Sequence, residues 1–442
     1  MNLFKEIFRK KFFLIYGMGK TGISSYDYLK KNNHVFLYDD NKKVFNKKKI
    51  KKFYIKKKKI NQIKFDYIVI SPGININSCS LKNYLKKNTD KIITDLDIFY
   101  VNNLKNKIIT ITGTNGKSTT AKLLNLILKD HKKDVRLCGN IGKPILLEKK
   151  ISKKTLFVVE ASSYQIAYSK LFKTNYALVL NISPDHLERH GSMEKYINAK
   201  FKLIKEQSKE DFAYVNKKDK YLSKKINKSR VLSKVVSVNS KKNENFQKKI
   251  NNPYFLSEGN RENLSFIFSI SAQLNLQKKK IIKIINKFKG LKYRQEIIYK
   301  NSEITFINDS KATSFASTIN VLKTFKKVFW LVGGMAKLGD KFTMNKEECK
   351  NMNAYIFGKK KKFFIKQFKN KISYRCFKNL EIAVRQVLLD IIDDKNKSLH
   401  KTVLFSPSAA SFDSFKNFEE RGDYFNFLLR KYKFKKTINA IK

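Results

Sequence analysis

The sequence predicts an α/β protein of three domains, and three observations support this fold class. Short apolar runs rich in Ile, Val and Phe alternate with segments of helical periodicity along the chain. Several of these runs end in Gly-rich or polar segments, which is where parallel sheets bind ligands. The 442 residues are also too many for one ordinary hydrophobic core, so two or three domains are expected.

The first hundred residues carry a nucleotide-binding pattern. Its parts follow one another directly: a strand at 12–16, the turn Gly17-Met18-Gly19-Lys20-Thr21-Gly22, a helix to about residue 31, a strand at 35–38, and Asp39. A GxGxxG turn with an acidic residue roughly twenty positions later is the dinucleotide fingerprint of a Rossmann-like domain. A further strand at 67–70 ends in the turn Ser71-Pro72-Gly73, a second candidate ligand contact.

The most informative stretch follows at residues 108–120. A β-branched strand stops at Gly113, the segment Thr114-Asn115-Gly116-Lys117-Ser118 comes next, and apolar residues then recur at helical spacing. This is the layout of a phosphate-binding loop, in which backbone N–H groups and the helix N-terminus face an anion. The pattern matches the Walker motif only partly, because two residues rather than four separate its glycines. A plain Gly-rich turn before a common Lys is the alternative, which the order of strand, loop and helix disfavours.

Two later strands of the same region end in groups that suit a metal. The strand at 155–159 is followed by Glu160, and the strand at 176–180 leads to Asp185 and His186. A carboxylate past a strand end beside a phosphate loop suits Mg²⁺, although an N-cap or a salt bridge is the ordinary use of such a residue. His186 and His190 are also spaced for a transition metal on a helix, but no third ligand is evident. The Lys- and Asn-rich segment 217–253 is expected to be peripheral.

A third unit begins after Gly290. Its strands at 305–307, 328–332 and 402–405 end in the segments 308–313, 333–334 and 406–411. We therefore expect domains at 1–100, 101–291 and 292–442: an N-terminal Rossmann-like domain, a central P-loop ATPase-like parallel sheet, and a C-terminal Rossmann-like domain.

Composition excludes some classes of protein. The net charge of +59 invites a nucleic-acid interpretation, but only ten of the 95 basic residues are Arg, and the lysines are spread along the whole chain. We therefore expect no nucleic-acid partner. No apolar stretch reaches the length of a membrane span, so no membrane partner is expected. Four Cys without a CxxC pair predict a reducing, cytoplasmic location.

Two nucleotide-type sites in one chain suggest a ligase that activates a nucleotide-carried acid with ATP. Here the residues match a family, because the chain resembles the Mur ligases over nearly its whole length. The motifs that carry the resemblance are 17–22, Ser-Pro-Gly-Ile 71–74, Thr-Gly-Thr-Asn-Gly-Lys-Ser-Thr 112–119, Gly-Asn-Ile-Gly 139–142, Glu-Ala-Ser-Ser-Tyr-Gln 160–165, Asp-His 185–186, Tyr-Ile-Asn-Ala-Lys 196–200, Asn-Asp-Ser-Lys-Ala-Thr 308–313, Gly-Gly-Met-Ala-Lys 333–337 and 406–422.

The resemblance implies ATP-dependent ligation of D-glutamate to UDP-N-acetylmuramoyl-L-alanine through an acyl phosphate, with Mg²⁺ as cofactor, in peptidoglycan precursor synthesis. A monomer is expected. The last motif favours this member of the family over other Mur-type or folylpolyglutamate-type ligases, which remain the alternatives. The resemblance also implies that the fingerprint at 17–22 holds a uridine nucleotide rather than NAD.

The same resemblance assigns site residues. The UDP-substrate is expected at Gly19, Lys20, Thr21, Asp39, Ser71, Pro72, Gly73, Asn75, Asn140, Ser162 and Gln165. ATP is expected at Gly113, Thr114, Asn115, Gly116, Lys117, Ser118, Thr119, Asn263, Arg294, Asp309 and Lys311. D-glutamate is expected at Thr313, Lys337, Ser411 and Phe418.

The metal is expected at Ser118, Glu160, His186 and Lys200, the last as a carbamate, and the catalytic residues are Lys117, His186 and Lys200. Composition alone would make Lys200 one more surface lysine, so only the resemblance singles it out. One departure from the family pattern is Ser257-Glu-Gly-Asn-Arg-Glu-Asn263, in which Gly259 stands where a His is usual. Any contact made by that His is absent from this chain.

Overall fold

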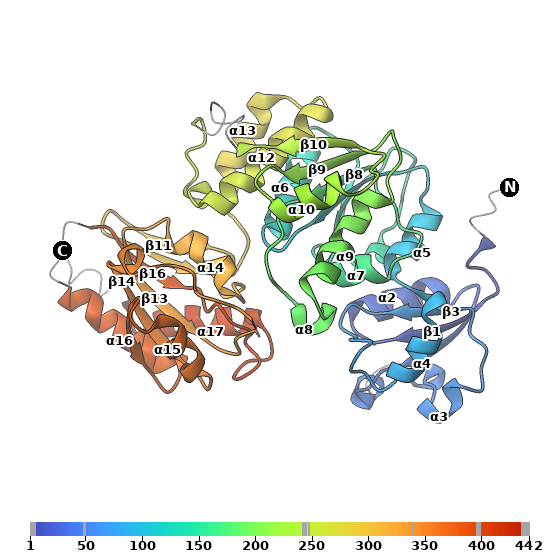
Figure 1. Cartoon of the computed structure of the whole chain (residues 1–442), viewed down its shortest axis with the longest axis horizontal. Coiled ribbons are helices and arrows are strands. Elements are labelled where there is room, and N and C mark those ends of the chain that lie inside the picture. The colour runs from blue at the N-terminus through green and yellow to red at the C-terminus, as the bar shows by residue number, and fades with distance from the viewer. Residues whose placement is uncertain are drawn as a thin grey trace. The chain divides into compact units, whose positions relative to one another are not determined.

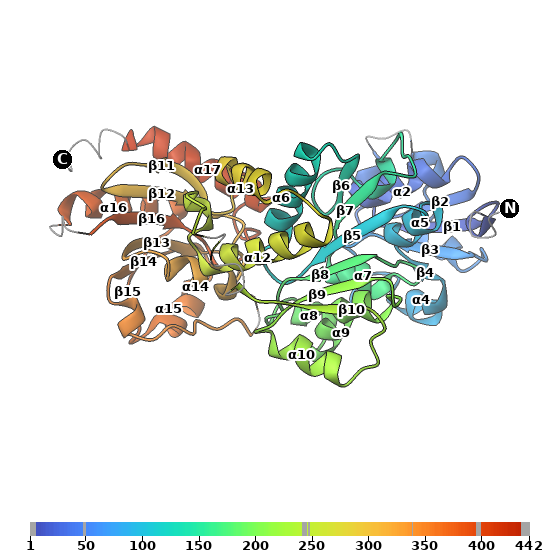
Figure 2. The same ribbon diagram turned by 90° about the horizontal axis from the view of Figure 1, so that it is seen from above.

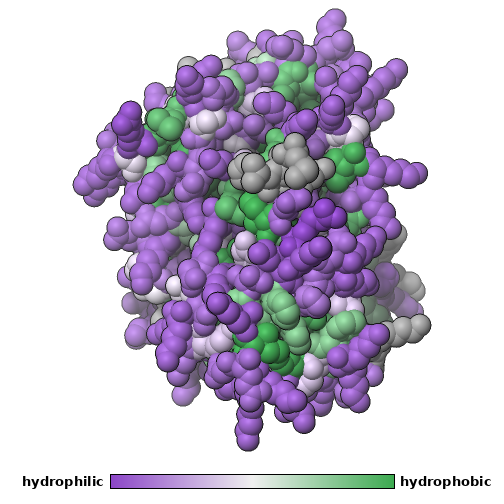
Figure 3. Space-filling view, turned by 90° about the vertical axis from the view of Figure 1, so that its right-hand side faces the viewer, coloured by the Kyte–Doolittle hydropathy of each residue, from purple (hydrophilic) through white to green (hydrophobic). Residues whose placement is uncertain are grey.

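The computed structural model describes residues 6–46, 50–240, 245, 248–337, 339–394 and 399–434 of the chain. Three sheets follow one another in sequence and are flanked by helices, which confirms the predicted α/β class (Figure 1). None of the helices in these residues is long and apolar enough to cross a membrane. The face in Figure 3 is mostly hydrophilic, as the lysine-rich composition requires.

The first sheet has the strand order β2-β1-β3-β4, and all its pairs are parallel. Its elements are β1 Phe12–Tyr16, α2 Lys20–Leu29, β2 His34–Tyr38, α3 Lys57–Ile60, β3 Tyr67–Ile70, α4 Lys82–Lys87, β4 Ile92–Ile93 and α5 Asp95–Asn102. The glycines of the fingerprint are used as predicted, since a Cβ on Gly22 would lie 1.9 Å from Gly17 O. This close approach lets α2 begin directly above the end of β1.

The central sheet has the order β10-β9-β8-β5-β7-β6 and is wholly parallel, as predicted. Figure 2 shows these strands side by side in that order. The strands are β5 Lys107–Thr112, β6 Val135–Gly139, β7 Leu156–Glu160, β8 Tyr176–Val179, β9 Phe212–Asn216 and β10 Lys234–Val238. The helices that follow them are α6 Lys117–Asp130, α7 Ser163–Tyr168, α8 Leu187–His190, α9 Met193–Lys205, α10 Lys220–Asn227, α12 Glu258–Gln273 and α13 Lys278–Lys287.

The expectation that 217–253 is peripheral was wrong in part. Within it, α10 packs on α9 and β10 extends the sheet by one strand. β10 is an edge strand whose side chains are mostly exposed, although its Val-rich sequence is typical of a strand.

The third sheet has the order β11-β12-β16-β13-β14-β15. Its strands are β11 Glu296–Lys300, β12 Ile304–Asn308, β13 Lys327–Gly333, β14 Met352–Phe357, β15 Ser373–Cys376 and β16 Lys401–Phe405. Its helices are α14 Phe315–Leu322, α15 Lys361–Phe368, α16 Leu380–Asp393 and α17 Phe418–Lys431. One apolar cluster joins the strands to α16 and α17, and another joins them to α14 and α15, so both faces are covered. β11 pairs antiparallel with β12, an addition that the sequence pattern did not predict.

The described residues fall into two compact units. One unit takes those in 1–182, 188–239 and 265–281, and the other those in 183–187, 240–264 and 282–442. The three sheets lie inside the predicted ranges 1–100, 101–291 and 292–442, but contacts group the first two sheets together, so the domain boundaries stay a prediction.

Two buried carboxylates on α5 help to explain that grouping. Asp97 Oδ1 accepts the backbone N–H groups of Lys170, Leu171 and Phe172 at 2.7, 2.7 and 3.1 Å, and its Oδ2 accepts that of Thr94 at 2.8 Å. The carboxyl of Asp95 is fully enclosed, and burial raises its pKa to about 6. Charge-assisted bonds of this kind hold the loop after α7 of the central region to the first helix beyond the N-terminal sheet.

Candidate active site

The phosphate loop forms where the sequence predicts it. β5 ends at Thr112, and Gly116 caps α6 with φ of 83°, a left-handed conformation that favours glycine. Lys117 Nζ turns back over the loop and donates to Gly113 O and Thr114 O, both at 2.7 Å. The predicted residues from Gly113 to Thr119 thus surround one helix N-terminus, which attracts anions.

Asn181, which follows β8, holds this loop through hydrogen bonds. Asn181 Oδ1 accepts the N–H of Asn115 at 2.8 Å, and Asn181 Nδ2 donates to Asn115 O at 3.2 Å. The N–H of Thr114 donates to Asn181 O at 2.9 Å. Sequence analysis did not assign Asn181 to the site, although its place directly after a central strand is the signal that could have found it.

Lys200 lies at the loop rather than on the surface. Its side chain on α9 is only 2% exposed, and Nζ donates to Gly113 O at 2.9 Å and to Thr112 Oγ1 at 3.3 Å. One turn earlier on the same helix, the hydroxyl of Tyr196 is 2.9 Å from Thr114 Oγ1. Two α9 side chains therefore reach the phosphate loop, which composition could not indicate.

Glu160 is the strongest indication of a cation. It ends β7, next to β5 in the sheet, and is 4% exposed. Its Oε2 is buried and has no hydrogen-bond partner among the described residues. Burying a carboxylate oxygen without a partner is costly, so this atom fits a ligand for a hard cation such as Mg²⁺. The hydroxyl-bearing Ser118, 3% exposed at the start of α6, offers a second oxygen.

The transition-metal alternative finds no third ligand. The described residues contain no group of three or more His, Cys, Asp and Glu that could hold a metal ion. His190 Nε2 is 2.9 Å from Ser163 Oγ, and its ring stacks on Tyr164 with centroids 5.2 Å apart. His190 therefore packs against α7, in a setting that suits structure more than metal binding.

His186 and Asp185 belong to the second compact unit. His186 has φ of 56°, and its Nε2 is 3.3 Å from Asp185 Oδ2. Lys337 Nζ lies 2.5 Å from Asp185 Oδ1, so the lysine predicted for D-glutamate is paired with this carboxylate in the structure. A substrate carboxylate could replace Asp185 at the lysine, because both offer the same anionic oxygens.

Several residues predicted for the UDP-substrate gather at the first sheet. Asp39 Oδ2 accepts the N–H of Met18 at 2.6 Å, and Ser71 Oγ donates to Gly17 O at 2.6 Å. Both side chains thus fix the glycine turn. Gly19 and Lys20 are exposed at the start of α2, with Thr21 half-buried beside them. The helix N-terminus is accessible there to a phosphate.

The residues of the turn at 71–75 differ in their exposure and in their hydrogen bonds. Pro72 and Asn75 are half-buried and Gly73 is exposed, while Asn75 Oδ1 accepts the N–H of Asn77 at 3.1 Å. The carbonyl of Ile74 accepts Arg189 Nη2 at 2.5 Å, and the guanidinium of Arg189 stacks 3.6 Å above the ring of Tyr164. Sequence analysis missed Arg189, although it stands between the Asp-His motif and His190.

The central residues predicted for the same substrate lie beside Glu160. The N–H of Asn140 donates to Glu160 O at 3.0 Å, and Asn140 is exposed. Ser162 caps α7 and is half-buried, whereas Gln165 is 2% exposed and donates to Asp95 Oδ1 at 3.2 Å. The structure therefore gives Gln165 a bond inside the protein, and its predicted contact with the sugar remains a prediction.

Among the residues of the second unit that are predicted for ATP, Asp309 is a buried carboxylate. Asp309 is 6% exposed and accepts the N–H of Gln295 at 3.1 Å and the hydroxyl of Ser406 at 2.8 Å. Burial raises the pKa of Asp309 to about 7, against the lowering influence of these bonds and of Arg294. Asn263 on α12 is 4% exposed, and its Nδ2 donates to Asn260 Oδ1 at 3.3 Å.

The D-glutamate residues come from the ends of β12, β13 and β16. The loops after β13 and β16 are joined by two backbone bonds between Met335 and Ala410, at 2.8 and 2.9 Å. Ser411 is 3% exposed, and Thr313 and Phe418 are half-buried. Lys311 Nζ lies 3.6 Å from the ring centre of Phe418, so the two predicted sets touch. The predicted strand ends do meet at one edge of the third sheet.

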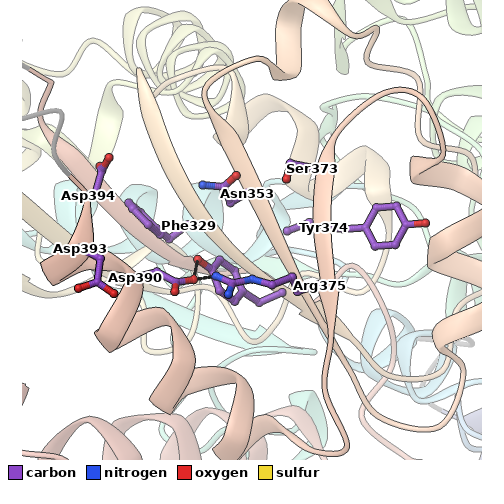
Figure 4. A pocket seen from close by; sticks show the side chains of 10 residues that line it. Phe329, Asn353, Ser373, Tyr374, Arg375, Asp390, Asp393 and Asp394 are labelled. Atoms are coloured by element: carbon purple, nitrogen blue, oxygen red, sulfur yellow. Dashed lines mark hydrogen bonds and ion pairs between the residues drawn. The ribbon is translucent and has the colours of Figure 1, made fainter.

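A cavity of about 330 Å³ lies elsewhere on the same sheet (Figure 4). It is lined by residues from the first halves of β13 to β15 and from the end of α16, among them Asp390, Asp393 and Asp394. Asp390 is engaged by Arg375 and Tyr355. Its acidic lining would repel a dicarboxylate, so it is no alternative site for D-glutamate.

Known proteins match this chain over most of its length. Residues 111–277 match the Mur ligase middle domain. The UDP-N-acetylmuramoylalanine–D-glutamate ligase of Rickettsia bellii is 34% identical, over 95% of this chain and 97% of the relative. The ligase of the same name from Francisella tularensis strain SCHU S4 is 34% identical, over 83% of this chain and 85% of the relative.

Solved structures agree on the fold. The MurF ligase from Thermotoga maritima, solved in complex with ADP, aligns with a TM-score of 0.57 over 97% of this chain and 99% of that one, at 16% identity. The MurC ligase of the same organism aligns with a TM-score of 0.52 over 96% of this chain and all of that one. With the phosphate loop, the buried Glu160 and the strand-end loops in place, the chain belongs to the Mur ligase family, among the UDP-N-acetylmuramoylalanine–D-glutamate ligases.

Proposed function

We propose that this protein ligates D-glutamate to UDP-N-acetylmuramoyl-L-alanine with cleavage of ATP to ADP and phosphate. The observation that carries the proposal is the convergence of Lys117, Lys200 and Ser118 at one phosphate loop. Glu160, with its unpartnered buried oxygen, ends the strand next to the one that leads into this loop. Membership of the family indicates the reaction, and the phosphate loop would bind and polarise the triphosphate.

The UDP-substrate would bind along the first sheet and the neighbouring part of the central one. Its phosphates suit the start of α2 above Gly19 and Lys20. Asn140 and Ser162 are accessible beside Glu160, where the acid end of the substrate must reach ATP. Asp39 and Ser71 would act by holding the glycine turn in shape, since both bond to its backbone.

The reaction follows two displacements. An oxygen of the alanyl carboxylate attacks the γ-phosphorus of ATP, the bond to the β-phosphate oxygen breaks, and ADP leaves. The amine of D-glutamate then attacks the acyl carbon, and phosphate leaves with the bonding electrons as the amide forms. Lys117 would move from the carbonyls of Gly113 and Thr114 to the phosphate charge, and the α6 N-terminus would stabilise it.

Mg²⁺ would be held by Ser118, by Glu160 and by a carbamate on Lys200. When bound, the ion would neutralise charge on the phosphates. A free ammonium at Lys200 would repel the ion, whereas a carbamate would offer anionic oxygens, so modification of this buried lysine suits the site. The parts assigned to His186 in the metal shell, and to Asn263, Arg294, Asp309 and Lys311 around ATP, stay predictions.

The deciding experiment measures phosphate release from ATP in the presence of UDP-N-acetylmuramoyl-L-alanine, with D-glutamate compared against other amino acids. We expect release that requires both substrates, and an amide product only with D-glutamate. Release that is equal with L-lysine or with a folate acceptor would contradict the proposed function and favour another ligase of the family.

A further inference from the structure

Arg421 is the most deeply buried charged side chain of the C-terminal unit, and none of the predicted roles uses it. It lies in the first turn of α17 and is 0% exposed. Nε donates to Ser310 Oγ at 3.1 Å, and Nη2 donates to Ser310 O at 2.7 Å and to Ala409 O at 3.0 Å. Nη1 is buried and has no hydrogen-bond partner among the described residues. Such a group is costly to bury unless it serves a purpose.

The guanidinium joins three strand ends. Ser310 follows β12 and Ala409 follows β16. Gly334 follows β13, and a Cβ placed there would lie 3.1 Å from Arg421 Nη1 and 2.5 Å from Ala410 O. A side chain at this position is therefore excluded, and the glycine backbone closes directly on the guanidinium.

The same side chain also positions the start of α17. Ser310 Oγ, which accepts from Arg421 Nε, donates in turn to Phe418 O at 2.8 Å. Arg421 is thus linked through one hydroxyl to Phe418, one of the residues predicted to contact D-glutamate. Thr313, Lys337 and Ser411 stand three residues beyond Ser310, three beyond Gly334 and two beyond Ala409.

The charge of Arg421 is not matched by an ion pair. Burial lowers its pKa to about 10, with Asp413 and Asp309 opposing, so the guanidinium stays protonated at neutral pH. No ion pair within 4.0 Å joins it to a carboxylate in the described part of the chain. Asp413 Oδ2 is buried without a hydrogen-bond partner, and the pKa of Asp309 is raised to about 7. A buried positive charge without a directly bonded carboxylate therefore lies at the strand ends, with Asp413 as the main negative charge that acts on it.

We propose that Arg421 is the positioning and specificity residue of the amino-acid subsite. Its hydrogen bonds hold the loops after β12 and β16 and, through Ser310, the start of α17, while its guanidinium packs against Gly334 after β13. Its buried charge favours an acceptor with two carboxylates over one with a neutral side chain. This inference rests on the proposed function and deepens it, because it names a residue that selects a dicarboxylic acceptor without touching it.

The test uses three variants and a matched control. Ser310→Ala removes the hydroxyl link alone, Arg421→Lys keeps the charge but cannot span three loops, and Arg421→Met removes the charge. Tyr424→Phe, which deletes one hydrogen bond from α17 to Glu381, controls for a general loosening of the helix. The measurements are the KM of each substrate, kcat/KM for D-glutamate against D-glutamine, and acyl-phosphate formation without acceptor, trapped by borohydride reduction.

We expect Ser310→Ala and Arg421→Lys to raise the KM for D-glutamate by about tenfold, the equivalent of one charge-assisted hydrogen bond. The KM for ATP and acyl-phosphate formation should stay as in the wild type and in Tyr424→Phe. Arg421→Met should in addition lose the preference for D-glutamate over D-glutamine, which a merely structural role would leave intact.

Three other results would contradict either this inference or the proposed function. If Ser310→Ala keeps the wild-type KM for D-glutamate, or if acyl-phosphate formation falls in parallel with ligation, Arg421 has no special role in the acceptor subsite. A folded Arg421→Met that retains the D-glutamate preference overturns the electrostatic part. A wild-type protein that forms acyl phosphate with no D-glutamate product contradicts the proposed function instead, so the two failures can be told apart.

Discussion

The phosphate loop and the amino-acid subsite are built in opposite ways. Residues 113–119 form one continuous stretch, and the backbone supplies most of the polar groups that a phosphate would meet. The proposed amino-acid subsite draws on loops after β12, β13 and β16 and on α17, which lie as far apart in sequence as Ser310 and Phe418. A site formed by one turn tolerates substitutions elsewhere in the chain. A site formed by four segments depends on the contacts that hold those segments in place.

The largest effect is expected at the continuous site. Lys117→Ala should abolish ligation while leaving the fold intact, because the two hydrogen bonds of Lys117 to Gly113 O and Thr114 O stay within its own loop. Removing one group that stabilises developing charge costs about 10²–10³ in rate. Steady-state turnover together with circular dichroism checks this. Near-normal turnover by a folded variant would show that the loop does not bind the transferred phosphate.

Lys200→Ala should be nearly inactive. This prediction tests how far the phosphate site depends on a group from outside the loop. Lys200 is brought to the loop by tertiary packing of α9, so its part in the phosphate site is not local. Short carboxylic acids added to the assay should restore part of the activity by supplying oxygens in the emptied space. Full activity without them would return Lys200 to the role of a structural lysine.

Ser411→Ala should raise the D-glutamate requirement more than the ATP requirement. Ser411 is buried in the loop after β16, next to Ala410 of the Met335–Ala410 bridge. An unpaired polar group costs about 1–3 kcal/mol, so D-glutamine should be discriminated against by roughly tenfold to hundredfold in the wild type. Competition between D-glutamate and D-glutamine in one assay measures this ratio. A preference for D-glutamine would break the assignment of this subsite.

The smallest expected effect is on stability, and it concerns the buried carboxyl of the assembled site. Burial raises the pKa of Asp309 from 3.8 to about 7, so between these values the folded protein keeps a proton that the unfolded chain has lost. Folding stability from this group is therefore greatest at low pH and declines as pH rises toward 7. Asp309→Asn has no charge to bury. As the pH rises from about 5 to about 8, its free energy of unfolding should therefore increase relative to that of the wild type.

Urea unfolding at the two pH values measures the difference. The alternative outcome, a variant that tracks the wild type at both pH values, would mean that Asp309 is ionised in the folded protein and compensated there. The hydroxyl chain from Asp309 through Ser406 and Thr318 to Ser408, with links of 2.8, 2.8 and 2.7 Å, can serve either protonation state because each hydroxyl can reverse its donor.

The sequence alone determined the features that depend on local chemistry. The alternation of strands and helices, the glycine turn at 17–22 and the phosphate loop at 113–119 follow from backbone conformation and side-chain period, which neighbouring residues settle among themselves. The order of motifs also indicated the family. Even the strand-end positions of Glu160 and Ser411 could be predicted, because parallel strands carry ligands at their carboxyl ends.

Only the tertiary structure decided which distant groups complete these sites. Composition and periodicity do not distinguish Lys200 from the other lysines, and only the family motif at 196–200 singled it out. Its burial against Gly113 depends on how α9 packs on the sheet. The same reasoning applies to Arg421, because the role of a buried charge depends on the groups that surround it in the fold and not on its neighbours in the chain. Periodicity reports which face of an element is apolar, whereas the partners of a polar side chain are fixed by contacts between segments far apart in sequence.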